Sequence, residues 1–142
     1  PSAAISRSDD FDFDVPCPRG GTANLSGESL LELDLEAGYF YLDLTAEQSH
    51  DGCSFRTEDG VDITVDGVLG FAAVRELREG LARASQSHSG SLDYVTSDGK
   101  EGTCLIDLAT DFAFASGTAT RTIAGSVCGH GIDMSTEWTE TE

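Results

Sequence analysis

The feature that most limits how this chain can fold is the alternation of apolar residues with carboxylates. In residues 8–18, SDDFDFDVPCP, the apolar side chains Phe11, Phe13 and Val15 alternate with aspartates. A period of two places the apolar side chains on one side of an extended strand, and it forms no apolar stripe on a helix. Residues 61–67, VDITVDG, repeat the alternation and end in Asp-Gly, which is a hairpin signal. The chain is therefore expected to consist of β-strands that cover one face.

Residues 30–45, LLELDLEAGYFYLDLT, predict a hairpin with one apolar and one acidic side. A turn at Ala37-Gly38 sets Leu33 opposite Leu42 and Glu32 opposite Asp43. A slip by one residue would bury the carboxylates, so the pattern specifies which side chains share a face.

Residues 104–129 predict a second hairpin. A three-residue loop, Ala115-Ser116-Gly117, supplies a glycine for the left-handed position of a bulged turn. Folding about Ser116 sets Asp111 opposite Arg121, an oppositely charged pair, and it sets the cysteines at 104 and 128 opposite one another. Residues that oppose each other on neighbouring strands lie within reach of a disulfide.

The four cysteines, Cys17, Cys53, Cys104 and Cys128, contain no C-x-x-C pair of the kind found in zinc ribbons or thioredoxin-like sites. An even number at wide spacing favours two disulfides and an oxidising compartment, whereas four reduced thiols in a cytosolic protein are the alternative. The hairpin about Ser116 pairs Cys104 with Cys128, which leaves Cys17 for Cys53. The two other connectivities remain open.

Residues 68–95 are ambiguous between helix and strand. Val74, Leu77 and Leu81 have helical spacing, but Gly80 interrupts the stripe and residues 78–80 can form a turn, which favours strands. The expected fold is all-β: a single antiparallel β-sandwich or curled sheet of about seven to nine strands, with two disulfides and at most one short helix near 70–85. The expected division is an N-terminal extension (1–16), a disulfide-linked β domain (17–135) and an acidic C-terminal tail (136–142).

The net charge of −18, with Lys100 as the only lysine, excludes several classes of partner. Nucleic-acid binding depends on Lys and Arg that displace counterions, and anionic membrane surfaces attract the same residues. No apolar run approaches the roughly 18 residues that span a membrane, so membrane insertion is not expected. Dense carboxylates serve solubility, and they also suit a saline habitat in which counterions screen them.

Glycine and cysteine punctuate the chain in a recognisable way. The motifs CPRGG (17–21), EGTC (101–104) and SVCGH (126–130), together with Cys53, resemble those of a loose group of uncharacterised secreted bacterial proteins that are rich in β-structure. The resemblance covers about residues 17 to 131 and implies no activity and no functional residues. It implies strands for residues 68–95.

The sequence favours neither catalysis nor a cofactor. His50 precedes Asp51 and Gly52, which indicates an exposed turn, and no G-x-S-x-G accompanies it. No histidine set for zinc and no distinct acid–base pair of carboxylates is present, so the chain is not expected to be an enzyme. Calcium is the one metal with candidate ligands, in two acidic segments where ordinary turn chemistry is the alternative. These ligands are Asp10, Asp12, Asp14, Asp59 and Asp62.

The expected function is structural. We expect a secreted protein of the extracellular space or cell surface that binds copies of itself head to tail and forms filaments or tubes. The segment 9–15 is expected to pair with the sheet of a neighbouring subunit, with Phe11, Phe13 and Val15 as the contact residues. The rival arrangement places this strand in the chain's own sheet. The alternative function is a monomeric binding module for glycan, peptide or Ca²⁺.

Overall fold

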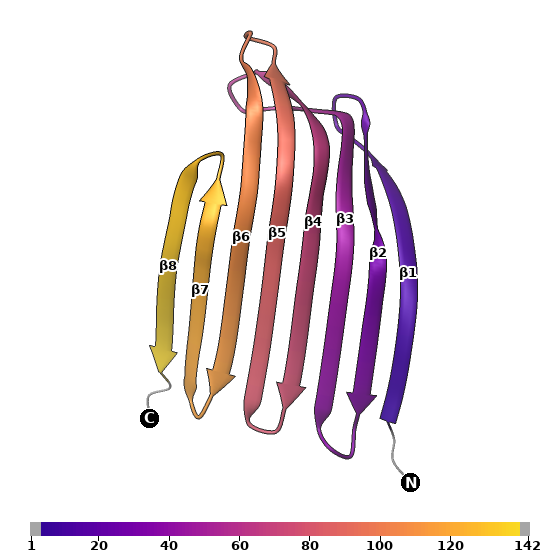
Figure 1. Cartoon of the computed structure of the whole chain (residues 1–142), viewed down its shortest axis with the longest axis vertical. Helices are drawn as coiled ribbons and strands as arrows, with labels where there is room; N and C mark the ends of the chain where they lie inside the picture. Colours follow the sequence, from indigo (N-terminus) through magenta and orange to yellow (C-terminus); the bar gives the residue numbers. More distant parts are fainter. Residues whose placement is uncertain (1–3, 140–142) are drawn as a thin grey trace.

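The computed structural model describes residues 4–139, which form one antiparallel sheet without a helix (Figure 1). The strands are β1 (Ala4–Pro16), β2 (Thr22–Asp34), β3 (Tyr39–Arg56), β4 (Asp62–Arg78), β5 (Leu81–Thr96), β6 (Glu101–Ala115), β7 (Thr118–Val127) and β8 (His130–Thr139). They lie side by side in sequence order, so every connection is a hairpin. The all-β prediction is confirmed, and of the two predicted architectures the structure has the single sheet, not the sandwich.

The sheet has two chemically distinct faces, because residues that oppose one another across each pair of strands share a side. The apolar face carries, for example, Phe11, Leu31, Leu42, Leu69 and Phe112. It collects the odd-numbered residues of β1, β2, β4 and β7 and the even-numbered residues of β5, β6 and β8. On β3 it takes even numbers up to His50 and odd numbers from Cys53, where the register shifts. The other side is the polar face.

Only a small part of this sheet is buried. Among residues 4–139, the buried apolar side chains are those of Ala46, Leu69, Ala73 and Cys104, all on the apolar face. No described side chain is completely buried. Much of the rest of the apolar face is half-buried by lateral contact between neighbouring side chains, and its edges are exposed, since no second layer covers it among residues 4–139.

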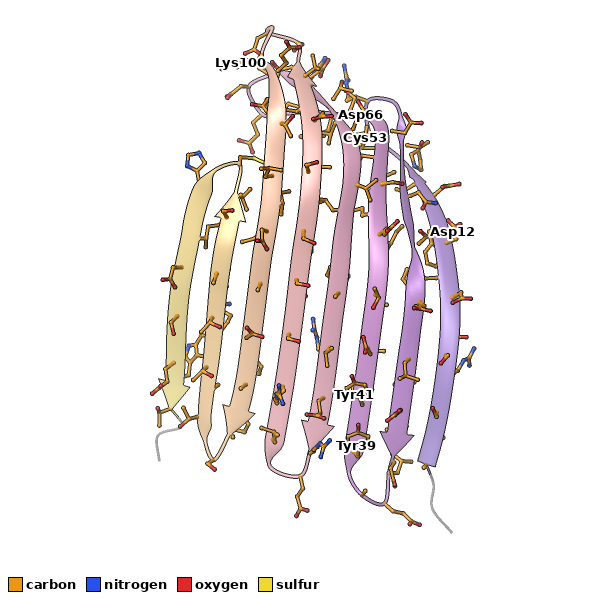
Figure 2. The ribbon with its side chains drawn as sticks, in the orientation of Figure 1. Asp12, Tyr39, Tyr41, Cys53, Asp66 and Lys100 are labelled. Carbon is orange, nitrogen blue, oxygen red and sulfur yellow. A yellow bond between two sulfur atoms is a disulfide. The ribbon has the colours of Figure 1, made fainter. Side chains whose placement is uncertain are left out.

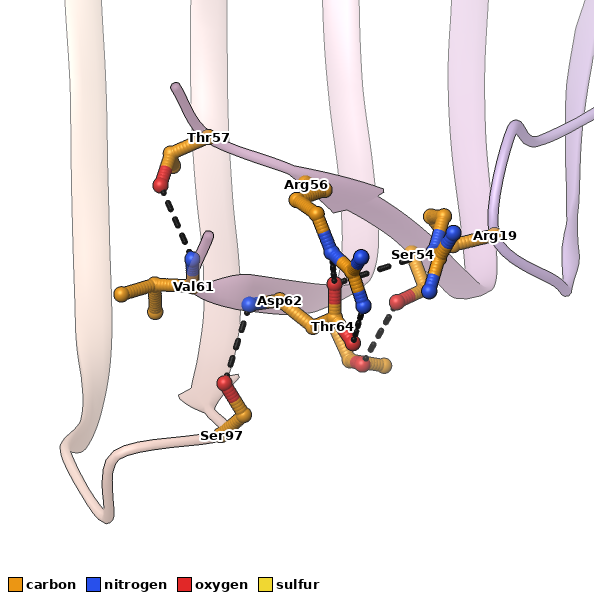
Figure 3. A network of polar contacts seen from close by, with 8 residues as sticks. All are labelled: Arg19, Ser54, Arg56, Thr57, Val61, Asp62, Thr64 and Ser97. Carbon is orange, nitrogen blue, oxygen red and sulfur yellow. Dashed lines mark hydrogen bonds and ion pairs between the residues drawn. The ribbon is translucent and has the colours of Figure 1, made fainter. Parts of the chain in front are cut away.

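Two glycines on the apolar face allow neighbouring strands to approach closely. Gly67 of β4 has φ 137° and Gly90 of β5 has φ 148°. A Cβ atom at Gly67 would overlap the carbonyl oxygen of Ser91, and one at Gly90 would overlap that of Val68. Such glycine kinks let a sheet bend. Beyond them, the tip of the β3–β4 hairpin runs across the neighbouring strands (Figure 3).

Both predicted disulfides are present. Cys17, in the loop between β1 and β2, is bonded to Cys53 of β3 with a Cα–Cα distance of 5.4 Å. Cys104 of β6 is bonded to Cys128, in the turn before β8, with a Cα–Cα distance of 4.3 Å. Each bond therefore attaches one outer hairpin to the four central strands. Two disulfides indicate that the chain folds in a non-reducing compartment.

The predicted hairpin about Ser116 is real, but its register is off by one residue. The turn contains two residues, Ser116 and Gly117, both with positive φ (53° and 79°), as a type I′ turn requires. Asp111 consequently lies opposite Thr122 and Phe112 lies opposite Arg121. The predicted charge pair is therefore wrong.

The predicted hairpin at 30–45 has the correct faces but the wrong turn. Leu33 pairs with Phe40 and Glu32 with Tyr41, a shift of two residues from the prediction. The turn occupies residues 35–38, where the backbone N–H groups of Glu36 and Ala37 donate to Oδ1 of Asp34. A shift of two keeps each side chain on its predicted face, because the side-chain period is also two.

Three other expectations are settled by the strand boundaries. Residues 68–95 are strands with a turn at residues 79–80, so the favoured strand interpretation is confirmed and the helical alternative near 70–85 is excluded. The Asp66-Gly67 pair lies inside β4 and makes no turn; the chain reverses at residues 57–61 instead. His50 and Asp51 lie within β3, at its irregularity, and not in an exposed turn.

The N-terminal segment belongs to the chain's own sheet. Phe11 pairs with Gly27, Phe13 with Leu25 and Val15 with Ala23, so β1 is matched to β2 over its whole length. The structure therefore has the rival arrangement, in which residues 9–15 form a strand of the chain's own sheet and are not donated to a neighbouring subunit. Residues 4–16 and 130–139 are edge strands of one sheet, while residues 140–142 of the predicted tail lie outside the described residues.

Candidate interaction surfaces

The polar face gathers nearly all the carboxylates that the strands carry. From β1 to β8 they are Asp10, Asp12, Asp14, Glu28, Glu32, Asp34, Asp43, Glu47, Asp51, Asp62, Asp66, Glu76, Asp93, Glu101, Asp107, Asp111, Asp133 and Glu137. Figure 2 shows Asp12 on the outer strand and Asp66 near the end of the sheet that holds Cys53. Serines and threonines fill much of the space between them. This face is suited to solvent and to counterions.

The calcium candidates are not brought together. Asp12 and Asp14 lie on the polar face of β1, where Nδ2 of Asn24 donates to both carboxylates at 2.6 and 2.8 Å. Asp59 lies in the turn between β3 and β4, and Asp62 begins β4. Among residues 4–139, no three His, Cys, Asp or Glu side chains converge as ligands of a metal ion would.

Asp62 is instead the centre of a polar network at the β3–β4 tip (Figure 3). Arg56 Nε lies 2.9 Å from its Oδ1, and Arg19 Nε, from the first loop, lies 3.7 Å away. The Asp62 N–H donates to Oγ of Ser97 at 3.0 Å. The hydrogen bond from Arg56 lowers the pKa of the Asp62 carboxyl, and burial partly opposes it. The network joins three successive hairpins at their tips.

The two tyrosines of β3 lie at the opposite end of the polar face (Figure 2). The Tyr41 hydroxyl donates to Oδ2 of Asp43 at 3.4 Å, and desolvation, followed by the negative charge of Asp43, raises the pKa of Tyr41. The guanidinium of Arg78 lies 5.1 Å from the centre of the Tyr39 ring. Tyr41 also lines a hollow of about 460 Å³ together with Glu76, Arg83 and Asp111.

The histidines lie on three different strands and form no common site. His50 of β3 has a buried Nδ1 atom without a hydrogen-bond partner among the described residues. The ring of His88, on β5, is tilted against Phe71 with a centroid distance of 4.8 Å. His130 is the first residue of β8. All three face the apolar side, where His88 acts as an aromatic packing partner.

Large apolar side chains are exposed chiefly on the apolar face and along its two edges. On β1, Phe13 and Val15 are 58% and 54% exposed; on β8, Met134 and Trp138 are 52% and 47% exposed. The predicted contact residues Phe11, Phe13 and Val15 thus share one face of an edge strand, with the Phe11 and Phe13 rings 5.9 Å apart. Contiguous exposed apolar surface on a soluble protein usually marks an interaction site.

Searches of family models, curated proteins and solved structures find no significant match to this chain. No helix among the described residues is long and apolar enough to cross a membrane.

Proposed function

We propose that this protein is a non-catalytic structural protein of the extracellular space or cell surface that assembles with copies of itself. The observation that carries the proposal is the open sheet. Over residues 5–16 of β1 and along β8, one side of the backbone pairs with no further strand of the described chain. Backbone groups on such an edge form a template for another chain unless charge or cover blocks them.

The strand order favours extension of the sheet from one subunit to the next. β1 and β8 run in opposite directions, because the sheet contains an even number of alternating strands. A copy displaced sideways therefore brings its β1 antiparallel to the β8 of its neighbour, with both apolar faces on the same side. Since the two edges differ, the contact is head to tail and leads to open filaments.

The exposed apolar residues support the same contact. In an extended sheet, Phe13 and Val15 of one subunit would lie on the same face as Met134 and Trp138 of the next. These side chains would gain the lateral neighbour that an edge strand lacks, which is how the central strands cover theirs.

Charge makes this assembly dependent on counterions. The polar side of β1 carries Asp10, Asp12 and Asp14, and that of β8 carries Asp133 and Glu137. Like charges on adjacent strands repel, and salt at 0.1 M screens them beyond about 10 Å. Filaments are therefore expected at high salt.

Electron microscopy of the purified protein across a range of NaCl concentrations tests the proposal. In the test variant, glutamates replace Ser6, Ser8 and Ser135 on the polar side of the two edge strands. The control places glutamates at Ser85, Ser87 and Ser89, on the same face of the central β5. Only the edge variant should lose filaments, since both variants change the net charge equally. Absence of filaments from the native protein at every salt concentration would refute the proposed function.

A binding module for a polar ligand such as a glycan is the second candidate, and the hollow beside Tyr41 favours it. Arg83, Glu76 and Asp111 would supply the polar contacts there. Chemical-shift changes confined to these residues on titration with oligosaccharides, in a protein that stays monomeric, would favour this candidate over assembly.

A further inference from the structure

The chain exposes far more surface than a compact protein of its size. Its accessible surface is 9374 Å². A folded monomer of 15.0 kDa is expected to expose about 7,000 Å². The excess is about 2,300 Å², which exceeds the roughly 800 Å² that each partner contributes to an interface of standard size. A chain of this length that leaves so much surface open lacks one layer of packing.

The apolar face has the dimensions to accept that layer. Eight strands at about 4.8 Å spacing, each about 40 Å long, give a flat area of roughly 1,400 Å². Within residues 4–139, this face carries four charged side chains: Arg7, Asp9, Arg75 and Arg121. Depletion of charge at the centre and exposed aromatic and Met side chains are features of protein interfaces.

We propose that the apolar face of a second copy of this chain covers this face. The two sheets then form a two-layer sandwich, with about 10 Å between layers, that buries more than 2,000 Å² in total. Interfaces of that size and apolar character belong to obligate homodimers. Charge also selects this occupant, because the polar face of another copy would bring its carboxylates onto apolar surface and leave them desolvated.

The charged groups on the apolar face already have partners within the same chain. Arg75 donates to the carbonyl oxygens of Val74 and Ser85 and to Oε1 of Gln86 at 3.1–3.2 Å. Arg7 Nε lies 2.7 Å from Asp9 Oδ2, and the guanidinium of Arg121 lies 5.6 Å from the centre of the Trp138 ring. These side chains can lie flat beneath a second sheet. They are poorly placed to capture the anionic head groups of lipids, which the net charge also repels.

The arginines determine how the two copies are oriented. Arg7, Arg75 and Arg121 occupy one row of paired residues across the sheet, near the end where β1 begins. The remaining residues of that row are Leu31, Leu42, Ala84, Phe112 and Thr136. If the two copies stacked with their arginine ends together, two such rows would face each other and their positive charges would repel. The two-fold axis therefore runs across the strands, so that the arginine end of one copy covers the disulfide end of the other.

This dimer rests on the proposed function only in supplying a self-associating subunit, and the two can fail separately. Dimers at low salt that form no filaments at any salt concentration would refute edge assembly and leave the sandwich intact. Filaments built of single-layer subunits would refute the sandwich and leave edge assembly intact.

Analytical ultracentrifugation of the full chain at low salt tests the sandwich. The native protein should be a dimer, and the dye ANS, which binds open apolar surface, should bind it weakly. Met134→Asp, on the apolar face of β8, should raise the dissociation constant of the dimer by about 30-fold or more, because the sandwich would bury an unpaired carboxylate. Leu105→Asp, at an exposed position on the polar face, should leave the dissociation constant unchanged.

A monomeric native protein at micromolar concentration that binds ANS strongly would overturn the proposal. A monomer that purifies with bound lipid would also overturn it, in favour of an amphiphile on the apolar face. These two measurements use the native chain, so they remain decisive if Met134→Asp fails to fold.

The orientation has an independent test at Lys100, the only lysine, which lies in the turn before β6 at the disulfide end (Figure 2). Spin labels attached to this amine should be separated by about a strand length, on the order of 50 Å, in the dimer. Separation below about 25 Å would place equal ends together and would overturn the proposed axis.

Discussion

The two faces of this sheet are made from the same strands, yet one face is solvated and the other is packed. On the polar face, carboxylates, serines and threonines face solvent, and some carboxylates are paired with arginine, as Asp62 is with Arg56. On the apolar face, the centre is covered by lateral packing while the rim remains open. The difference shows that alternation along each strand sorts residues by side, but it does not create a hydrophobic interior. A single sheet needs a second layer for that.

The strongest contrast between the faces should be seen at two adjacent residues of β4. Leu69 lies on the apolar face and is 9% exposed, whereas Val68 lies on the polar face and is 48% exposed. Leu69→Ala should lower the free energy of unfolding by about 2–4 kcal/mol, since it leaves a cavity. Val68→Ala should cost under about 1 kcal/mol. Urea denaturation, followed by circular dichroism, measures both.

Equal losses at these two positions would contradict the division of the sheet into a packed face and a solvated face. If the free energy of unfolding lost on Leu69→Ala grew with protein concentration, the packed face would also be an interface, because the cavity would then lie between subunits.

Salt should act on the polar face and spare the apolar one. Repulsion between carboxylates opposes folding, and counterions screen it, so the melting temperature should rise as NaCl is added. A variant with Glu28→Gln, Glu32→Gln and Glu47→Gln should have a higher melting temperature at low salt and a weaker salt dependence, worth about 1–2 kcal/mol in total. Calorimetry from low to molar NaCl measures this effect. A melting temperature that is indifferent to salt would remove the argument for a saline habitat.

The smallest effect concerns Asp62, a polar-face carboxylate that is paired with Arg56 and Arg19. The pKa of Asp62 is lowered by Arg56, so the ionised group stabilises the folded state above the ordinary aspartate pKa. That contribution is lost as the pH falls through the depressed value. Because the pair is exposed to solvent, its contribution to stability is small.

An NMR titration of the Asp62 carboxyl checks this pair. Arg56→Gln should return its pKa toward the ordinary value and reduce the acid sensitivity of the β3–β4 tip, while Arg78→Gln, elsewhere on β4, should not. An unchanged Asp62 pKa in Arg56→Gln would assign the shift to Arg19 instead.

The strands and the Cys104–Cys128 disulfide can be predicted from the sequence because both depend on local patterns, whereas Cys17–Cys53 follows only by elimination. Alternation fixes the face of each residue, and an error of two residues in the hairpin at 30–45 left every face unchanged. The register about Ser116 was missed because Ser116 itself adopts positive φ, which a non-glycine residue rarely does. That Ser-Gly turn resembles Asn-Gly turns in its conformation, and the signal in the sequence was the glycine alone.

The pairing partner of β1 could not be predicted from the residues of that strand. The same alternation suits a strand donated to a neighbour and one paired at home, and the choice depends on whether β2 offers a matching edge over its whole length. The sequence likewise could not predict that the apolar face lacks a second layer, since a sandwich and a single sheet require the same alternation in each strand. Number of layers is a property of the packing between strands distant in the chain.

The strict nearest-neighbour order of the strands has a consequence for folding and for evolution. Each strand finds its partner a few residues away along the chain, so the loops that must close are short and folding should be rapid for an all-β protein. A hairpin could be added or lost without rerouting any connection, as repeats are gained in linear arrays. Such changes would widen or narrow the molecule in steps of two strands, and each step would preserve which side of the molecule faces water.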